Sequence, residues 1–122
     1  MKKLITISLV ILFIIGFGVF ESIVSQKTYN EILGYANELE VALNTSEKDI
    51  SKDDNVVRIY EQMDEKWNNF KLFALALANH NQIKEFSQKL SMLKGYIVEN
   101  DKKESIVTLY MLKSQTEYLI RE

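Results

Sequence analysis

The first residues of the chain form its longest apolar pattern. After Lys2 and Lys3, residues 4–20 contain no charged side chain. The run is about seventeen residues long, or about 25 Å as a helix. Ile23 and Val24, with Glu21 and Ser22 at the headgroup level, extend it toward the bilayer core thickness of about 30 Å. The pattern therefore predicts a membrane-spanning helix at residues 4–24.

A cleaved signal peptide is the alternative to this membrane anchor, which comprises residues 1–24. Signal peptides have an apolar core of about 7–15 residues and a small-x-small cleavage site. The run here is longer, and its small pair, Gly16 and Gly18, lies inside it. We therefore expect an uncleaved anchor, with secretion after signal cleavage as the alternative.

The charges beside the span predict its orientation. Positive residues stay on the cytoplasmic side of a membrane, and Lys2 and Lys3 precede the span. We expect a single-pass protein of the cell membrane. Its N-terminus should be cytoplasmic and its body, residues 25–122, extracytoplasmic.

Beyond the span, apolar residues recur at helical spacing, and no alternating pattern of a strand occurs. The predicted helices cover about residues 22–44, 52–78, 81–99 and 102–121. No breaker separates the span from the first of them, and short connections favour antiparallel neighbours. The pattern predicts an all-α fold, in which an N-terminal transmembrane helix continues into an antiparallel bundle of about four helices.

The apolar stripes of the last three helices indicate the core. Stripes that step by three and four residues lie on one face of a helix and are typically buried. The candidate core residues are Tyr60, Met63, Trp67, Phe70, Phe86, Leu90, Leu93, Leu109 and Leu112.

Turn and cap residues separate the helices. The polar segment 44–55 contains Ser46 and Ser51, each followed three residues later by an aspartate, and either serine could cap the second helix. Asp101, followed three residues later by Glu104, resembles a capping box at the start of the fourth helix.

The end of the second helix carries more apolar residues than one face can hold. Leu72, Phe73 and Leu75 lie off its stripe. A helix that is apolar all round is usually buried on several sides, whereas a large exposed apolar patch marks an interaction site. We therefore treat these three residues as a candidate surface for a partner or for the bilayer.

Composition excludes several kinds of site. The chain has no cysteine, so it has no disulfide and no cysteine-based metal site. Its formal charge is −2, and it is −4 without Lys2 and Lys3. An acidic body argues against a nucleic-acid partner and against binding to anionic lipid.

His80 is the single histidine. The nearest acids, Asp64, Glu65 and Glu85, form no recognised ligand spacing with it. We expect His80 to cap a helix or to pack on Trp67. No glycine-rich phosphate loop is present, so we assign no catalytic, cofactor-binding or metal-binding residue and do not expect an enzyme.

Several of these features together resemble a family of small bacterial membrane proteins, domain-of-unknown-function family 4363. The resemblance consists of the basic start and apolar span, Glu65-Lys66-Trp67, the segment from Ala78 to Ile83 around His80, and an acidic turn at 99–101. It implies a membrane-anchored helical architecture in Gram-positive, often spore-forming, bacteria. The family has no assigned activity. Its members often have acids directly after the histidine, where this chain has Asn81 and Gln82.

The anchor, the apolar surplus and the missing catalytic residues favour a non-enzymatic interaction module of the bacterial cell or spore envelope. Its partner would be a membrane or envelope protein, or a second copy of the chain. One alternative is a small-ligand-binding or sensor accessory domain with an apolar pocket between helices. A less favoured one is an envelope hydrolase that uses carboxylates and His80.

Overall fold

The computed structural model describes residues 2–77 and 80–121, without the side chains of 21–22, 72–77 and 121. This part of the chain contains no strand. Its elements are α1 (Lys2–Thr45), a short 3-10 helix η1 (Ile50–Lys52), α2 (Asp54–Leu77), α3 (His80–Val98) and α4 (Lys102–Arg121). The predicted all-α fold is confirmed, and the span and the first helix of the bundle form one helix.

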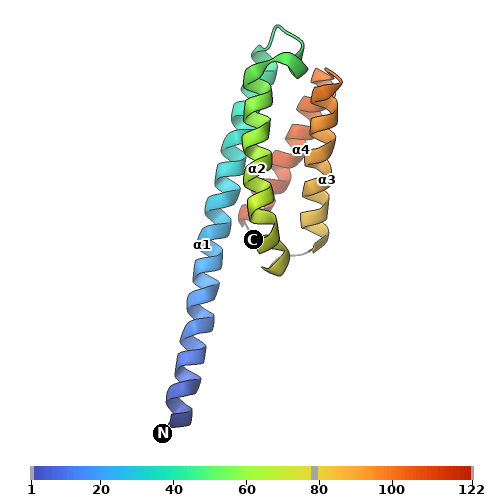
Figure 1. Ribbon diagram of the computed structural model, residues 1–122. Helices are drawn as coiled ribbons and strands as arrows, with labels where there is room; N and C mark the ends of the chain where they lie inside the picture. The colour runs from blue at the N-terminus through green and yellow to red at the C-terminus, as the bar shows by residue number, and fades with distance from the viewer. Residues whose placement is uncertain (1, 78–79, 122) are drawn as a thin grey trace.

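The helices alternate in direction and pack as an antiparallel bundle (Figure 1). α1 contacts α2 and α4, and α3 packs against α4 and α2. The N-terminal half of α1 projects beyond the bundle as a free rod (Figure 1). It leaves the bundle at the end where α2 ends, α3 begins and α4 ends (Figure 1). We call this the proximal end, and the end with η1 the distal end.

The two halves of α1 differ in their surroundings. Large apolar residues between Leu4 and Ile23 are exposed, for example Phe13 at 73%. Beyond them, one side of the helix is buried in the bundle, at steps of three and four residues; its members are Tyr29, Ile32, Ala36, Leu39 and Leu43. A stripe with this period is the pattern that a helix buries on one face.

Aromatic side chains fill the space between α2 and α3. The rings of Trp67 and Phe86 have centroids 4.1 Å apart, and Phe70 meets Tyr29 of α1 edge to face at 5.3 Å. Bulky residues increase the distance between helix axes, and the backbones of α2 and α3 approach less closely than those of α1 and α2. The candidate core residues are all buried: Tyr60, Met63, Trp67, Phe70, Phe86, Leu90, Leu93, Leu109 and Leu112.

Two core side chains with polar atoms are hydrogen-bonded inside this region. The Trp67 Nε1 group donates to Ser87 Oγ at 2.9 Å. The Tyr60 hydroxyl donates to the Leu90 carbonyl at 3.0 Å. Buried polar groups are costly without partners, so these bonds allow α2 to bury both residues against α3.

The turn from α3 to α4 holds the distal end together. Asn100 adopts a left-handed conformation with φ 58°. Its amide donates to the Ile97 carbonyl, and the Asp101 amide donates to the Tyr96 carbonyl at 2.8 Å, which is the Schellman pattern of a helix end. The Asn100 side-chain oxygen then accepts from the Ile50 amide at 2.9 Å, so the turn fastens η1 to α3.

The start of α2 differs from the prediction. Neither Ser46 nor Ser51 caps it. Asp53 does, because its carboxylate accepts from the Asn55 amide at 3.0 Å and its carbonyl accepts from the Val57 amide. Both serines instead donate to aspartates, Ser46 to Asp53 at 2.6 Å and Ser51 to Asp49. A charged acceptor makes the stronger bond, so the carboxylates take the capping role.

At the start of α4, Asp101 accepts a bond from the Glu104 amide through its side chain, at 3.1 Å. Its carbonyl also accepts from the Ser105 amide and from the Ser105 hydroxyl. Asp101 thus links the end of the turn to the first turn of α4.

Candidate functional site

The residues considered for chemistry do not form a metal site. Within the part of the chain that the structure describes, no group of three or more histidine, cysteine or acidic side chains could hold a metal ion. His80 is exposed and is the first residue of α3.

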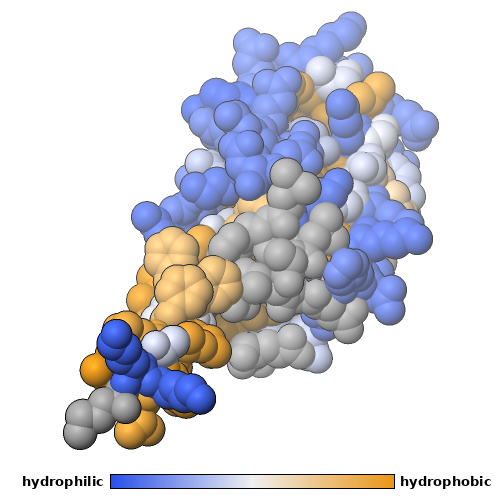
Figure 2. Space-filling view, turned by 60° about the horizontal axis from the view of Figure 1, so that its bottom comes forward, coloured by the Kyte–Doolittle hydropathy of each residue, from blue (hydrophilic) through white to orange (hydrophobic). Residues whose placement is uncertain are grey.

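The most extensive apolar surface is the projecting half of α1. None of the residues in its most apolar stretch of 18 residues is buried in the bundle. Figure 2 shows this contrast between the hydrophobic rod and the largely hydrophilic bundle behind it. By length and composition α1 can cross a membrane, and a signal sequence near an N-terminus meets the same criteria.

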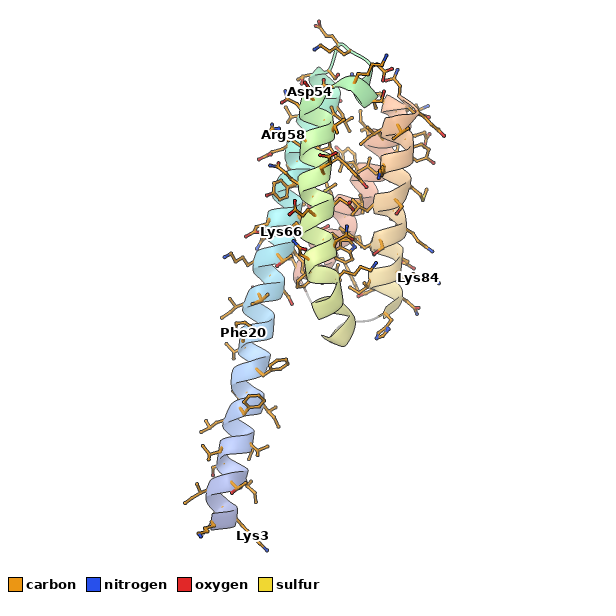
Figure 3. The ribbon with its side chains drawn as sticks, in the orientation of Figure 1. Lys3, Phe20, Asp54, Arg58, Lys66 and Lys84 are labelled. Carbon is orange, nitrogen blue, oxygen red and sulfur yellow. The ribbon has the colours of Figure 1, made fainter. Side chains whose placement is uncertain are left out.

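A depression of about 390 Å³ lies where the rod enters the bundle. Both α1 and α2 contribute apolar and polar residues to its lining, which consists of Phe20, Val24, Thr28, Lys66, Asn69 and Phe70. Lys66 forms an ion pair with Glu31 of α1, and the hydrogen bond that the Lys66 ammonium donates to this carboxylate raises the pKa of the ammonium. In Figure 3, Phe20 lies on α1 level with the lower end of α2, and Lys66 lies beside α1.

The register of α2 against α1 follows from two contacts. Lys66 pairs with Glu31, and Phe70 packs on Tyr29. Since the helices are antiparallel, the turns of α2 after Phe70 continue toward the projecting rod (Figure 1). The side chains of the candidate surface, Leu72, Phe73 and Leu75, lie outside the described residues.

A second ion pair joins α1 to α4. Lys113 Nζ lies 2.6 Å from Glu40 Oε2, and both side chains are mostly shielded from solvent. The same ammonium lies 5.2 Å from the centroid of the Tyr110 ring, within the range of a cation–π interaction. Lys113 therefore positions Tyr110 on the outer side of α4.

Two carboxylates of the distal end, those of Asp49 and Asp53, have lowered pKa values. Hydrogen bonds from the Ser51 hydroxyl and amide lower the pKa of Asp49. The bond from the Ser46 hydroxyl lowers the pKa of Asp53, the residue that caps α2.

Burial raises the pKa of the Tyr60 phenol, with a further contribution from Asp64, so Tyr60 remains a neutral donor to Leu90.

The outer face of α4 is an apolar surface that we did not expect from the sequence. Val107, Tyr110, Met111 and Tyr118 are 41–56% exposed. They border or extend an open groove of about 790 Å³, whose lining is Lys89, Ile106, Val107, Tyr110, Met111, Ser114 and Gln115. The signal was present as a second stripe, because Val107, Met111, Ser114 and Tyr118 step by four, three and four residues.

Gln115, which lines this groove, has one buried polar atom without a hydrogen-bond partner among the described residues. The Gln115 amide nitrogen donates to the Gln82 carbonyl of α3 at 3.1 Å, which fixes the orientation of the amide. Its Oε1 atom is buried and accepts no hydrogen bond within the described part of the chain. Such acceptors are rare in folded proteins.

Comparison with known proteins identifies the bundle. A family model described as a domain of unknown function (DUF4363) matches residues 27–122. The match covers α2, α3, α4 and the half of α1 that packs in the bundle, and it begins after the apolar rod. No curated protein and no solved structure matches the chain.

Proposed function

Because the chain belongs to the DUF4363 family, whose function is unknown, we propose a role that rests on its own structure. It is a single-pass membrane protein that holds a helical bundle at the outer face of the cell membrane. The bundle acts as a non-enzymatic interaction module of the bacterial cell or spore envelope.

The continuity of α1 carries this proposal. One helix includes both the exposed apolar rod and five residues of the bundle core, from Tyr29 to Leu43. Val24 already packs against the core, and Thr28 is buried. Removal of the rod would therefore require a cut inside, or directly before, a helix that the bundle needs. We take this arrangement as support for an anchor over a disposable signal.

The charges support one orientation. Lys3 lies at the free end of the rod, and the polar distal end with Asp54 lies at the opposite end of the molecule (Figure 3). Since positive flanks remain in the cytoplasm, Lys2 and Lys3 favour a cytoplasmic N-terminus. The bundle, which is acidic, then lies outside.

The apolar surfaces favour an interaction role over the alternatives. A small-ligand-binding domain calls for a pocket that encloses most of its ligand, whereas the groove on α4 is open to solvent. An envelope hydrolase calls for a buried carboxylate near His80, and His80 itself is exposed. A protein partner, from the membrane, the envelope or a second copy, suits a flat apolar face.

Single cysteines test the proposal, because the natural chain has none. Lys3→Cys and Lys52→Cys each place one thiol at an exposed position, at the two ends of the molecule. In intact cells that express the full chain, a membrane-impermeant maleimide should label Lys52→Cys and not Lys3→Cys. After lysis both should be labelled, and both chains should sediment with membranes at full mass. Protection of Lys52→Cys in intact cells contradicts the orientation, and a shortened soluble chain contradicts the anchor.

A further inference from the structure

We propose that the end of α2, residues 72–77, lies in the outer leaflet of the membrane, in contact with lipid beside the rod. The inference rests on the proposed function, because the rod sets the level of the membrane. It assigns membrane lipid as the partner of the candidate surface, Leu72, Phe73 and Leu75. The membrane then holds the bundle at two places, the rod and the end of α2.

The level of the end of α2 follows from its pairing with α1. The two helices are antiparallel, and Lys66 of α2 pairs with Glu31 of α1. From this pair α2 continues for about eleven residues, or about 16 Å, to Leu77. The same length measured back along α1 ends at Phe20, and Figure 3 shows Phe20 level with the lower end of α2. The end of α2 therefore lies beside the apolar run of the rod.

The fourth helix, α4, ends well short of this level. Its pairing with α1 is fixed by Lys113 and Glu40, from which it continues for about eight residues, or about 12 Å, to Arg121. The same length along α1 ends at Ile32, so α4 stops about 18 Å before the level of Phe20. In Figure 1 the last turn of α2 also extends past the start of α3. Among the described elements, α1 is thus the helix that runs beside the end of α2.

The composition of the end of α2 matches a lipid environment. Residues 72–77 are three leucines, two alanines and one phenylalanine. A single neighbouring helix covers one side of a helix, and apolar surface on the other sides is costly in water. The lipid that surrounds the rod at the same level supplies an apolar environment for those sides.

The depression between α1 and α2 has the polarity of a membrane surface. The lining residues that remain accessible are Phe20, Val24, Lys66 and Asn69. Phe20, on the rod side, is 58% exposed. Lys66 lies at the level of Glu31, about 10 Å farther from the rod's apolar run than Val24. Apolar residues with a lysine and an asparagine above them follow the change from acyl chains to headgroups.

The charges near the proximal end differ from those of the whole body. Residues 66–77 and 80–89, on the two helices that meet there, contain four lysines and one glutamate. Residues 46–65, toward the distal end, contain seven acidic and three basic residues. The acidity that argues against anionic lipid therefore lies at the distal end, whereas lysines near a membrane are attracted to anionic headgroups.

The free carbonyl groups of a helix end limit how far α2 can enter the membrane. The last four carbonyls of a helix have no hydrogen-bond partner within it, and hydrocarbon offers them none. The end of α2 therefore fits the boundary of headgroups and acyl chains, where water still reaches the backbone. This depth agrees with the level of residues 20–24 in the rod.

Nitroxide labels on single cysteines of the full chain measure this depth in vesicles of phosphatidylglycerol and phosphatidylethanolamine. Glu61, Asn68 and Leu75 are seven residues apart, so Glu61→Cys, Asn68→Cys and Leu75→Cys place labels along one face of α2. Glu61 and Asn68 are exposed, so their variants are matched controls. Collisions of each label with oxygen, which concentrates in lipid, are compared with collisions with a water-soluble nickel chelate.

The label at Leu75→Cys should have a ratio of oxygen to nickel collisions that is several-fold higher than the labels at Glu61→Cys and Asn68→Cys. Leu72→Cys, about 4–5 Å farther from the membrane along the helix, should give an intermediate ratio and supplies a second position. Trp67 fluorescence verifies that the bundle core is intact in each labelled chain.

The other outcomes overturn the inference in distinguishable ways. A nickel-accessible label at Leu75→Cys, with a label at Leu12→Cys of the rod in lipid, refutes contact of α2 with the membrane and leaves the proposed function intact. Low collision rates with both reagents at Leu75→Cys show that protein, and not lipid, covers the end of α2. A nickel-accessible label at Leu12→Cys refutes the spanning rod and with it both proposals.

Discussion

The two halves of α1 are the same helix in two environments. From Leu4 to Phe20 the helix is apolar on every side and makes no core contact, whereas from Tyr29 to Leu43 only one stripe is apolar and that stripe is buried. An all-round apolar surface matches an apolar solvent, and a one-sided stripe matches a protein core with water on the other side. Under the proposed function, the change of pattern along one helix corresponds to a membrane boundary near residues 20–24.

Residues of the same type therefore have different roles in the two halves of α1. Leu12 is 65% exposed and Leu39 is fully buried, although both are leucines in the middle of their helical segments. Leu39 should stabilise the bundle through packing, and Leu12 should stabilise the position of the chain in a membrane through transfer from water. Each half can therefore be disrupted without the other.

Alanine substitutions should show the largest contrast. Leu39→Ala leaves a cavity in the core and should lower the free energy of unfolding of the bundle by about 2–5 kcal/mol. Leu12→Ala should change it by less than about 0.5 kcal/mol. Denaturant titration of the full chain in detergent, followed by the fluorescence of the single tryptophan, Trp67, measures this quantity. Equal losses for the two variants would mean that the rod packs on the bundle.

Lysine substitutions should reverse the contrast. Leu12→Lys places a charge near the centre of the span and should cost about 2.5–3.5 kcal/mol of membrane insertion. Val41→Lys lies at an exposed position of the bundle half and should leave insertion unchanged. The fraction of each chain that resists extraction from membranes by alkaline carbonate gives the readout, and full insertion of Leu12→Lys would argue against a spanning rod.

Substitutions at the distal end should lower the stability of the bundle by a smaller amount than Leu39→Ala does. Asn100→Ala removes the acceptor of the Ile50 amide and puts alanine in a left-handed conformation, which should cost about 1–3 kcal/mol. Asn100→Gly removes the acceptor but tolerates the conformation, so it should cost less. The order of the two midpoints in denaturant separates the contributions, and a glycine variant that is less stable than the alanine variant would contradict the role of the turn.

Acid should lower the stability of the bundle and leave the membrane association of the rod unchanged. The pKa values of Asp49 and Asp53 are lowered in the folded chain by bonds from serines. The stability that these bonds contribute is therefore present above the ordinary carboxyl pKa of about 3.9. It is lost as the pH falls through the lowered pKa values.

Residues 4–20 contain no ionisable side chain, so membrane association should not change over that range. Thermal unfolding and membrane flotation from pH 6 down to about pH 2, which spans the ordinary carboxyl range, test this contrast. Asp53→Asn should reduce the acid sensitivity of unfolding, because an amide still caps a helix but does not titrate. An unchanged acid profile in this variant would assign the sensitivity to other carboxylates.

Periodicity was sufficient to predict the helices and their core, because each stripe is a local pattern that only a helix buries on one side. The contacts that close the distal end were not predictable in the same way. Ile50 and Asn100 are far apart in the chain, and their hydrogen bond exists only after α3 has packed beside η1. The sequence pattern assigned the cap of α2 to a serine. It does not show that Ser46 donates to Asp53 and that the Asp53 carboxylate accepts from the start of the helix.

The outer face of α4 was missed for a related reason. The stripe from Leu109 to Leu119 is sufficient to explain the helix as a core element, without the second stripe from Val107 to Tyr118. Burial separates the two, because Leu112 is 1% exposed and Met111 is 48% exposed. A count of heptad positions on both sides of each helix would have indicated this surface.

The central claim is that a single straight helix joins the membrane to the bundle, and one distance tests it most directly. Leu9→Cys and Val41→Cys place two spin labels at exposed positions in the two halves of α1, in a chain without other thiols. In a lipid bilayer, pulsed electron paramagnetic resonance should give a narrow distribution near about 48 Å, the length of the intervening helix at 1.5 Å per residue. A broad or much shorter distribution would show a hinge between rod and bundle, and the loss of the Leu9→Cys label from the mature chain would show that the rod is removed.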